Sequence, residues 1–193
     1  MAEEITVEFY EMKRAPRFKA ALILKYILLA GVLSFLGWVY ETMLLLVETG
    51  RFSDRGALSL PLCPIYASSL LGLYFLAGTP DRGRGILKGV KGKRLRWGLY
   101  FALAFLLPTL AELLFGLLFD RAWGIRLWDY SHIPLNYKGY ICLPVSLAWA
   151  VLIFLFMKCL FEPIKRRVFV LENHTAAALA LVLLAFVGLD MLF

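Results

Sequence analysis

The chain alternates long apolar runs with shorter polar connections. Five runs stand out, at about residues 26–47, 62–77, 97–119, 141–157 and 175–193. A helix needs about 20 apolar residues to cross the hydrocarbon core of a bilayer. The second and fourth runs are short, so we expect each of them to cross with little tilt or to be partly re-entrant. The pattern predicts an all-α membrane protein, a bundle of five transmembrane helices in a single polytopic domain, residues 1–193.

Composition agrees with this pattern. The mean hydropathy is +0.75, and only 18% of the residues are charged, against about 25% in soluble domains. Residues 1–25 are expected to form a charged cytoplasmic segment. The first apolar run could be mistaken for a signal peptide, but its length, the charged stretch before it and the lack of a small-x-small cleavage site favour a retained span.

The basic residues predict the orientation of the chain. The segment before the first run and the second and fourth connections hold 16 of the 21 Lys and Arg. Because basic residues concentrate on the cytoplasmic side, we predict an N-terminus inside and a C-terminus outside. The net charge of +7 then reflects this bias and an attraction of the basic loops to anionic lipids. It implies no nucleic-acid partner, since no nucleic-acid motif accompanies it. The Gly-rich basic connection at residues 78–96 is expected to be mobile and lipid-facing.

Three carboxylates fall inside the apolar runs, where charge is costly and often functional. Glu41 and Glu112 each lie about seven residues from the outer end of a run, which is roughly 10 Å of helix. Asp190 lies in the same outer layer. One interpretation is a ligand site near Pro108, which should kink its helix. The alternative, given equal weight, is a set of ion pairs that lock the helices together, with partners among Arg51, Arg55, Arg121 and Arg126.

The stretch "WDYSHIPLNYKGYICLP" (residues 128–144) joins the third and fourth runs. Its aromatic residues suit the membrane–water boundary. Asp129 and Ser131 can close local turns, and Asn136 tolerates left-handed backbone. We predict an ordered outer cap that lies over the carboxylates and includes Trp128 and Tyr130. The alternative is an aromatic belt without a ligand, which explains the Trp and Tyr residues but not the polar ones.

The cysteines and the absence of catalytic motifs limit the chemistry. Cys63 and Cys142 start two runs on the outer side, where a disulfide could form; the favoured interpretation is two small buried side chains. The sequence contains no P-loop, HExxH or GxSxG motif. We therefore expect no metal, no cofactor and no catalytic residues, and any ATPase would be a separate chain.

Several motifs together resemble the ABC-transporter type IV (CmpB-like) permease family of bacterial membrane proteins. The motifs are "GWVYET", "GRFSDRGALSLPLCPIY", the Glu of the third run and "LWDYSHIPLNYKGYICLPVSLAW". The resemblance covers roughly residues 37–160. The chain departs from the family pattern at Leu60, Ala67 and Tyr140.

The resemblance implies a transport component of the bacterial plasma membrane that works with a separate ATPase subunit. It adds Tyr66 to the candidate residues. The expected outward-facing pocket is lined by polar and aromatic side chains: Glu41, Arg55, Tyr66, Glu112, Trp128, Asp129, Tyr130, Ser131, Asn136 and Asp190. Because five spans are few for a complete pathway, we also expect a homo-oligomer or a larger assembly.

Two other functions remain open at this point. The first is a membrane enzyme that acts on a lipid or envelope substrate, with Glu41 or Glu112 as the acid–base group. The second is a membrane scaffold in which the carboxylates only make structural ion pairs.

Overall fold

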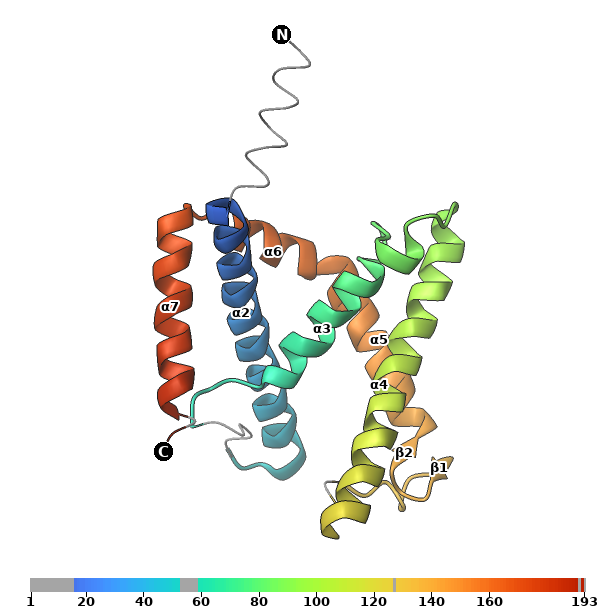
Figure 1. Cartoon of the computed structure of the whole chain (residues 1–193). Coiled ribbons are helices and arrows are strands. Elements are labelled where there is room, and N and C mark those ends of the chain that lie inside the picture. Colours follow the sequence, from blue (N-terminus) through green and yellow to red (C-terminus); the bar gives the residue numbers. More distant parts are fainter. Residues whose placement is uncertain (1–15, 53–58, 127, 191, 193) are drawn as a thin grey trace. The chain divides into compact units, whose positions relative to one another are not determined.

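The computed structural model describes residues 16–52, 59–126, 128–190 and 192. The described part is mostly helical, which confirms the predicted all-α class (Figure 1). The α-helices are α2 (Pro16–Thr49), α3 (Pro64–Ala77), α4 (Lys93–Trp123), α5 (Leu143–Cys159), α6 (Phe161–Val170) and α7 (Asn173–Asp190). A 3₁₀ turn, η1 (Gly85–Leu87), and two short strands, β1 (Asn136–Tyr137) and β2 (Ile141–Cys142), complete the elements.

A helix is present at each of the five apolar runs, but the helices differ in length. Three are long and apolar enough to cross a membrane: α2, α4 and α7. Only Leu160 separates α5 from α6. Together these two helices are long and apolar enough to cross a membrane as one broken span. Helix α3 has 14 residues, so it rises about 21 Å, less than the thickness of about 30 Å of a hydrocarbon core. The count of five crossings and the orientation therefore stay predictions.

Two segments differ from the sequence-based expectation. Helix α2 begins at Pro16 rather than near residue 26, because Pro suits a first helical turn and nothing in the next ten residues breaks a helix. The basic connection after the fourth run contains α6, which was expected to be a loop. Its buried Phe161 and Val168 lie on one face, and Glu162 near its start and Arg167 near its end match the helix dipole.

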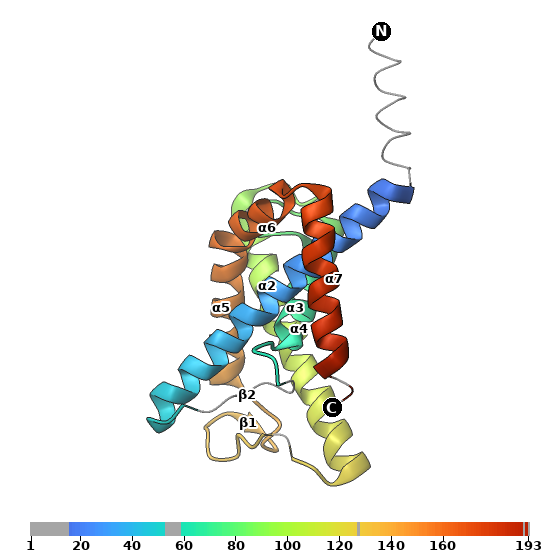
Figure 2. The same ribbon diagram turned by 90° about the vertical axis from the view of Figure 1, so that its left-hand side faces the viewer.

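The chain divides into two compact units, which are described separately. The first comprises residues 1–68 and 163–193, and the second comprises residues 69–162. In the first unit α2 and α7 lie side by side and run in the same direction (Figures 1 and 2). Gly31 permits this approach, because a side chain there would collide with Leu183.

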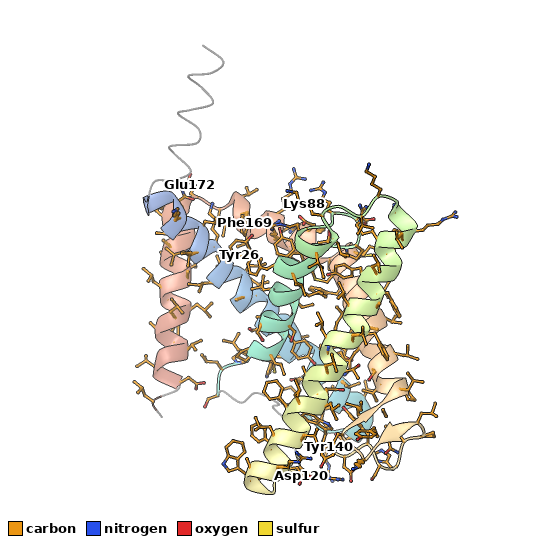
Figure 3. The ribbon with its side chains drawn as sticks, turned by 45° about the vertical axis from the view of Figure 1, so that its right-hand side comes forward. Tyr26, Lys88, Asp120, Tyr140, Phe169 and Glu172 are labelled. Carbon is orange, nitrogen blue, oxygen red and sulfur yellow. The ribbon has the colours of Figure 1, made fainter. Side chains whose placement is uncertain are left out.

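Helix α6 is held against the start of α2 within the first unit. Lys25 Nζ donates a hydrogen bond to the Phe169 carbonyl oxygen across 3.1 Å. The Tyr26 and Phe169 rings meet edge to face, 5.0 Å apart (Figure 3). These contacts fix the polypeptide turn that leads into α7.

In the second unit, α4 packs along α5. Small buried residues, Ala104 on α4 and Ala150 on α5, allow close helix packing. Phe154 of α5 contacts the rings of Trp97, Tyr100 and Phe101. The connection between α5 and the end of α4 carries the β1–β2 hairpin (Figure 2).

Candidate functional site

The described part of the connection from α4 to α5, residues 124–126 and 128–142, folds on itself through main-chain and side-chain hydrogen bonds. We call it the outer loop, after its predicted position. Trp128 Nε1 donates to the Tyr140 carbonyl oxygen across 2.7 Å, and the Tyr130 amide donates to the Gly139 carbonyl oxygen across 2.9 Å. These bonds hold the first half of the loop against the second half. The cap predicted from the sequence is thus an ordered structure.

The turn of the β1–β2 hairpin contains two residues with positive φ. Tyr137 and Tyr140 close its turn through a 3.0 Å hydrogen bond from the Tyr140 amide to the Tyr137 carbonyl. The two central residues, Lys138 and Gly139, have φ of 52° and 76°, as a type I′ turn requires. A side chain at position 139 would also collide with Asp129 Oδ1. Gly139 therefore meets both a conformational and a steric requirement.

The polar residues of the WDYS motif build this loop. Asp129 Oδ1 accepts a hydrogen bond from the Ser131 amide at 2.9 Å and lies 3.2 Å from Arg126 Nη1. The Ser131 hydrogen bonds, with the nearby Arg126 guanidinium, lower the pKa of the Asp129 carboxyl below its ordinary value. Asn136 donates to the carbonyls of Ser131 and Ile133 at 3.2 and 2.8 Å and accepts from the Gly139 amide at 3.1 Å. Asp129, Ser131 and Asn136 thus have defined structural roles.

One stripe of α4 receives the aromatic side chains of the outer loop. Glu112, Gly116 and Asp120 are spaced four residues apart and share a helix face. The Tyr130 hydroxyl donates to Glu112 Oε1 across 3.4 Å, and the Tyr140 hydroxyl donates to Asp120 Oδ2 (Figure 3). At Gly116 an added Cβ would lie 3.0 Å from the Tyr140 ring and 3.6 Å from the Trp128 ring.

The two oxygens of the Glu112 carboxylate differ in their hydrogen bonding. Its Oε2 is buried and has no hydrogen-bond partner among the described residues. A buried polar group without a partner typically costs about 1–3 kcal/mol. On the neighbouring helix α5, the buried Ser146 Oγ is also without a partner in the described part of the chain. The two unsatisfied oxygens thus lie on neighbouring helices of the second unit.

In the first unit a tyrosine also meets a predicted carboxylate. The Tyr66 hydroxyl donates to Glu41 Oε1 across 2.5 Å, and the Tyr66 ring lies against Tyr40, 6.1 Å between centroids. The ring sits over Gly37, where any side chain would collide with it. Asp190, at the end of α7, accepts hydrogen bonds from the Ser59 amide at 2.9 and 3.2 Å.

The candidate residues are divided between the two units. Glu41, Tyr66 and Asp190 belong to the first unit, and Glu112 and the outer loop belong to the second. Arg55 lies outside the described residues. Within the described part, neither Glu41 nor Glu112 makes an ion pair, and Arg126 pairs with Asp129 instead. Within the described part, tyrosine hydroxyls bond both carboxylates, and an ion pair with Arg55 stays a prediction.

Three residues at the contact between α4 and the outer loop were not predicted from the sequence. Gly116, Asp120 and Tyr140 were not singled out as site residues, although the spacing of Glu112, Gly116 and Asp120 marks one helix face. Tyr140 was noted for its departure from the family pattern, and its hydroxyl bonds Asp120. That helix-face spacing is the signal that could have identified the stripe.

Cys63 and Cys142 are both buried. Cys63 directly precedes α3, and its amide donates to the Ser34 carbonyl across 3.0 Å. Cys142 caps the start of α5. The burial agrees with the favoured interpretation of two small packed side chains, and the alternative of a disulfide is tested by the intact mass of the unreduced protein.

Residues 28–193 match the family described as "Putative ABC-transporter type IV". The chain belongs to this family. No curated protein and no solved structure matches it. Family membership and the apolar helices indicate a membrane protein and are compatible with a component of membrane transport. An ABC-type family also suggests an ATPase partner.

Proposed function

We propose that this protein is the permease-like membrane component of an ABC-type transporter in the bacterial plasma membrane. In this proposal a polar site beneath the outer loop binds the transported species, and Glu112 is its ligand-binding carboxylate. The outer loop, docked on α4 through Tyr130 and Tyr140, covers the site and controls access from outside. The ATPase is a separate chain, because the sequence contains no nucleotide-binding motif.

The observation that carries the proposal is the buried Glu112 Oε2, which has no partner among the residues that the structure describes. A carboxylate at the centre of a membrane helix costs about 2.5–3.5 kcal/mol on insertion scales. Tyr130 offers only a long hydrogen bond to the other oxygen, at 3.4 Å. A positively charged or proton-donating ligand at Oε2 would remove this cost, so the site favours a small cation, a proton or an amine over an anion.

The proposed topology has five crossings, a cytoplasmic N-terminus and an outward-facing loop. The parallel course of α2 and α7 supports an odd number of crossings, since it puts the start of α2 and the end of α7 on opposite sides (Figure 1). The basic connections between α3 and α4 and around α6 support the cytoplasmic side. Five helices are few for a complete pathway, so we propose that the working unit is a homo-oligomer or a larger assembly.

A solute screen tests the binding site. The purified protein is heated in the presence of cations, amines and different pH values, and its melting temperature is compared with that of Glu112→Gln and Glu41→Gln variants. We expect a stabilising solute whose effect disappears in Glu112→Gln. If the variants fold normally and keep every ligand-induced shift, the proposed site is wrong.

Co-purification tests the assignment to an ABC-type transporter. The tagged protein is extracted from its own membrane with a mild detergent, and accompanying chains are identified by mass spectrometry. We expect a P-loop ATPase at a fixed ratio. Altered lipid or envelope products in a deletion strain, independent of any ATPase, would instead support the membrane-enzyme alternative.

A further inference from the structure

The basic connection between α3 and α4 was expected to be mobile, and the structure gives it a defined backbone. Gly78 and Gly83 form a bridge, and the Tyr100 hydroxyl of α4 donates to the Gly78 carbonyl across 3.2 Å. Arg96 Nε and Nη2 donate to the carbonyls of Pro80 and Asp81 at 2.9 and 2.8 Å. Hydrogen bonds from Arg96 and Tyr100 therefore hold the connection against the first turns of α4.

Some basic residues of this region have internal partners. Lys93 and Lys158 both approach the Trp97 ring, with Nζ 4.8 and 3.7 Å from its centroid. Lys93 also lies 3.7 Å from Asp81, whose carboxylate accepts the Trp97 indole N–H at 3.1 Å. Arg84 stacks on the Tyr74 ring at 4.9 Å. The Asp81 carboxylate thus already has Lys93 and Trp97 as partners within the protein.

Four other basic residues of the same region are exposed and have no carboxylate within ion-pair distance in the described part of the chain. They are Arg82, Lys88, Lys91 and Arg94. Two large apolar side chains are exposed among them, Ile86 at 57% and Leu95 at 59%. The segment thus presents a mixed basic and apolar surface on a fixed backbone.

The position of this surface suits the boundary of a membrane. It lies at the start of α4, at the end of the second unit opposite Asp120 and Tyr140 (Figure 3). Trp97, with lysines near its ring, is the kind of residue that marks the membrane–water interface. Lys side chains there bury their stems and keep their charge at the head-group level. The exposed Ile86 and Leu95 can then contact acyl chains.

We propose that residues 82–95 form a binding site for the phosphate head group of an acidic phospholipid, and that Ile86 and Leu95 contact its acyl chains. The four exposed cations supply the positive charge, since each Lys or Arg near a surface contributes about 1 kcal/mol to anionic-lipid binding. The fixed backbone reduces the entropy lost on binding. The inference rests on the membrane position of α4 and is independent of the Glu112 site.

Lipid titration of the full-length protein in micelles of a non-ionic detergent tests the proposal. The ligands are phosphatidylglycerol, phosphatidylcholine with the same chains, and glycerol phosphate as the free head group, and binding is followed by native mass spectrometry. We expect phosphatidylglycerol to bind more tightly than either of the other two. The triple variant Arg82→Gln, Lys88→Gln, Lys91→Gln should lose on the order of a hundredfold in affinity, about fivefold for each cation.

A charge-matched triple variant is the control. Arg51→Gln, Arg121→Gln and Lys138→Gln remove the same charge elsewhere and should leave phosphatidylglycerol binding within twofold of wild type. Ile86→Ser keeps every charge and should weaken phosphatidylglycerol more than glycerol phosphate. If the first triple variant does not fold, Lys88→Gln and Lys91→Gln alone should each lose about fivefold.

Two outcomes would overturn the proposal. The first is equal binding of phosphatidylglycerol and phosphatidylcholine by the wild-type protein. The second is equal weakening by both triple variants, which would indicate an effect of net charge alone. Neither outcome bears on Glu112, whose variants are tested with solutes and not with lipids.

Discussion

The Tyr130 hydroxyl lies 3.4 Å from Oε1 of Glu112 and so joins the outer loop to an apolar helix at a carboxylate. The other oxygen of the same carboxylate is buried without a partner in the described part of the chain. One oxygen of the group thus contacts the outer loop, and the other is the oxygen at which we propose that a ligand binds.

Tyr130→Phe should loosen the loop. The change removes the hydroxyl and leaves both oxygens of Glu112 without a donor in the described part of the chain, which we expect to lower the free energy of unfolding by about 1 kcal/mol. The measurement is the melting temperature together with tryptophan fluorescence, to which Trp128 contributes. Tyr137→Phe is the matched control, because Tyr137 is 53% exposed; equal effects of both changes would contradict the role given to Tyr130.

Gly116→Leu should separate the outer loop from α4. The added side chain would occupy the space of the Tyr140 and Trp128 rings, and overpacking of this kind costs about 1–3 kcal/mol. Gly98→Leu on the same helix is the control, since nothing lies within 4 Å of an added Cβ there. Loss of the Trp128 signal in Gly116→Leu but not in Gly98→Leu is the expected result, and an unchanged signal in both would show that the loop does not rest on Gly116.

Acid should weaken the outer loop through Asp129. The folded-state pKa of its carboxyl is below the ordinary 3.8, chiefly because the Ser131 amide donates to it. Folding therefore favours the ionised form, and this contribution is present above the unfolded pKa and is lost as the pH falls through the lowered one. We expect the melting temperature of wild type to fall more steeply below about pH 4 than that of Asp129→Asn. If the melting temperatures of the two proteins fall in parallel with pH, Asp129 does not cause the loss of stability in acid.

Glu41 and Tyr66 should be energetically coupled in the first unit. Tyr66→Phe keeps the ring over Gly37 but removes the donor to Glu41, with an expected loss of about 1–3 kcal/mol. Glu41→Gln and the double variant complete a double-mutant cycle. A coupling energy of about 0.5–3 kcal/mol is expected for side chains in contact, and additive effects would show that the hydrogen bond contributes nothing.

The local elements of the fold could be predicted from particular residues. Helices occupy all five apolar runs, and the turn-forming Asp129, Ser131 and Asn136 indicated an ordered loop. The start of α2 and the existence of α6 were not predicted. The charged residues near both segments suggested loops, but helix propensity carries α2 back to Pro16, and an amphipathic pattern with its two buried residues forms α6.

The partners of the site residues could not be predicted. Apolar side chains surround most of α4, so its hydrophobic pattern marks no face toward a neighbour. The pairing of Tyr130 with Glu112, and of Tyr140 with Asp120, depends on the rotation of α4 and on the path of the hairpin. For the same reason, the sequence predicted one depth for Glu41 and Glu112, which stays a prediction, but it could not show that each one meets a tyrosine.

The sequence by itself determined that this is a helical membrane protein with an ordered loop after its third apolar run. Hydrophobicity and backbone propensity are properties of single segments, so they can be derived from the sequence without knowledge of the packing. The tertiary structure alone decided that Tyr130 meets Glu112 and Tyr140 meets Asp120, that Glu112 keeps one buried oxygen without a partner in the described part of the chain, and that the basic connection is fixed to α4. Those facts depend on side chains from separate segments meeting in space, and no single segment encodes such a meeting.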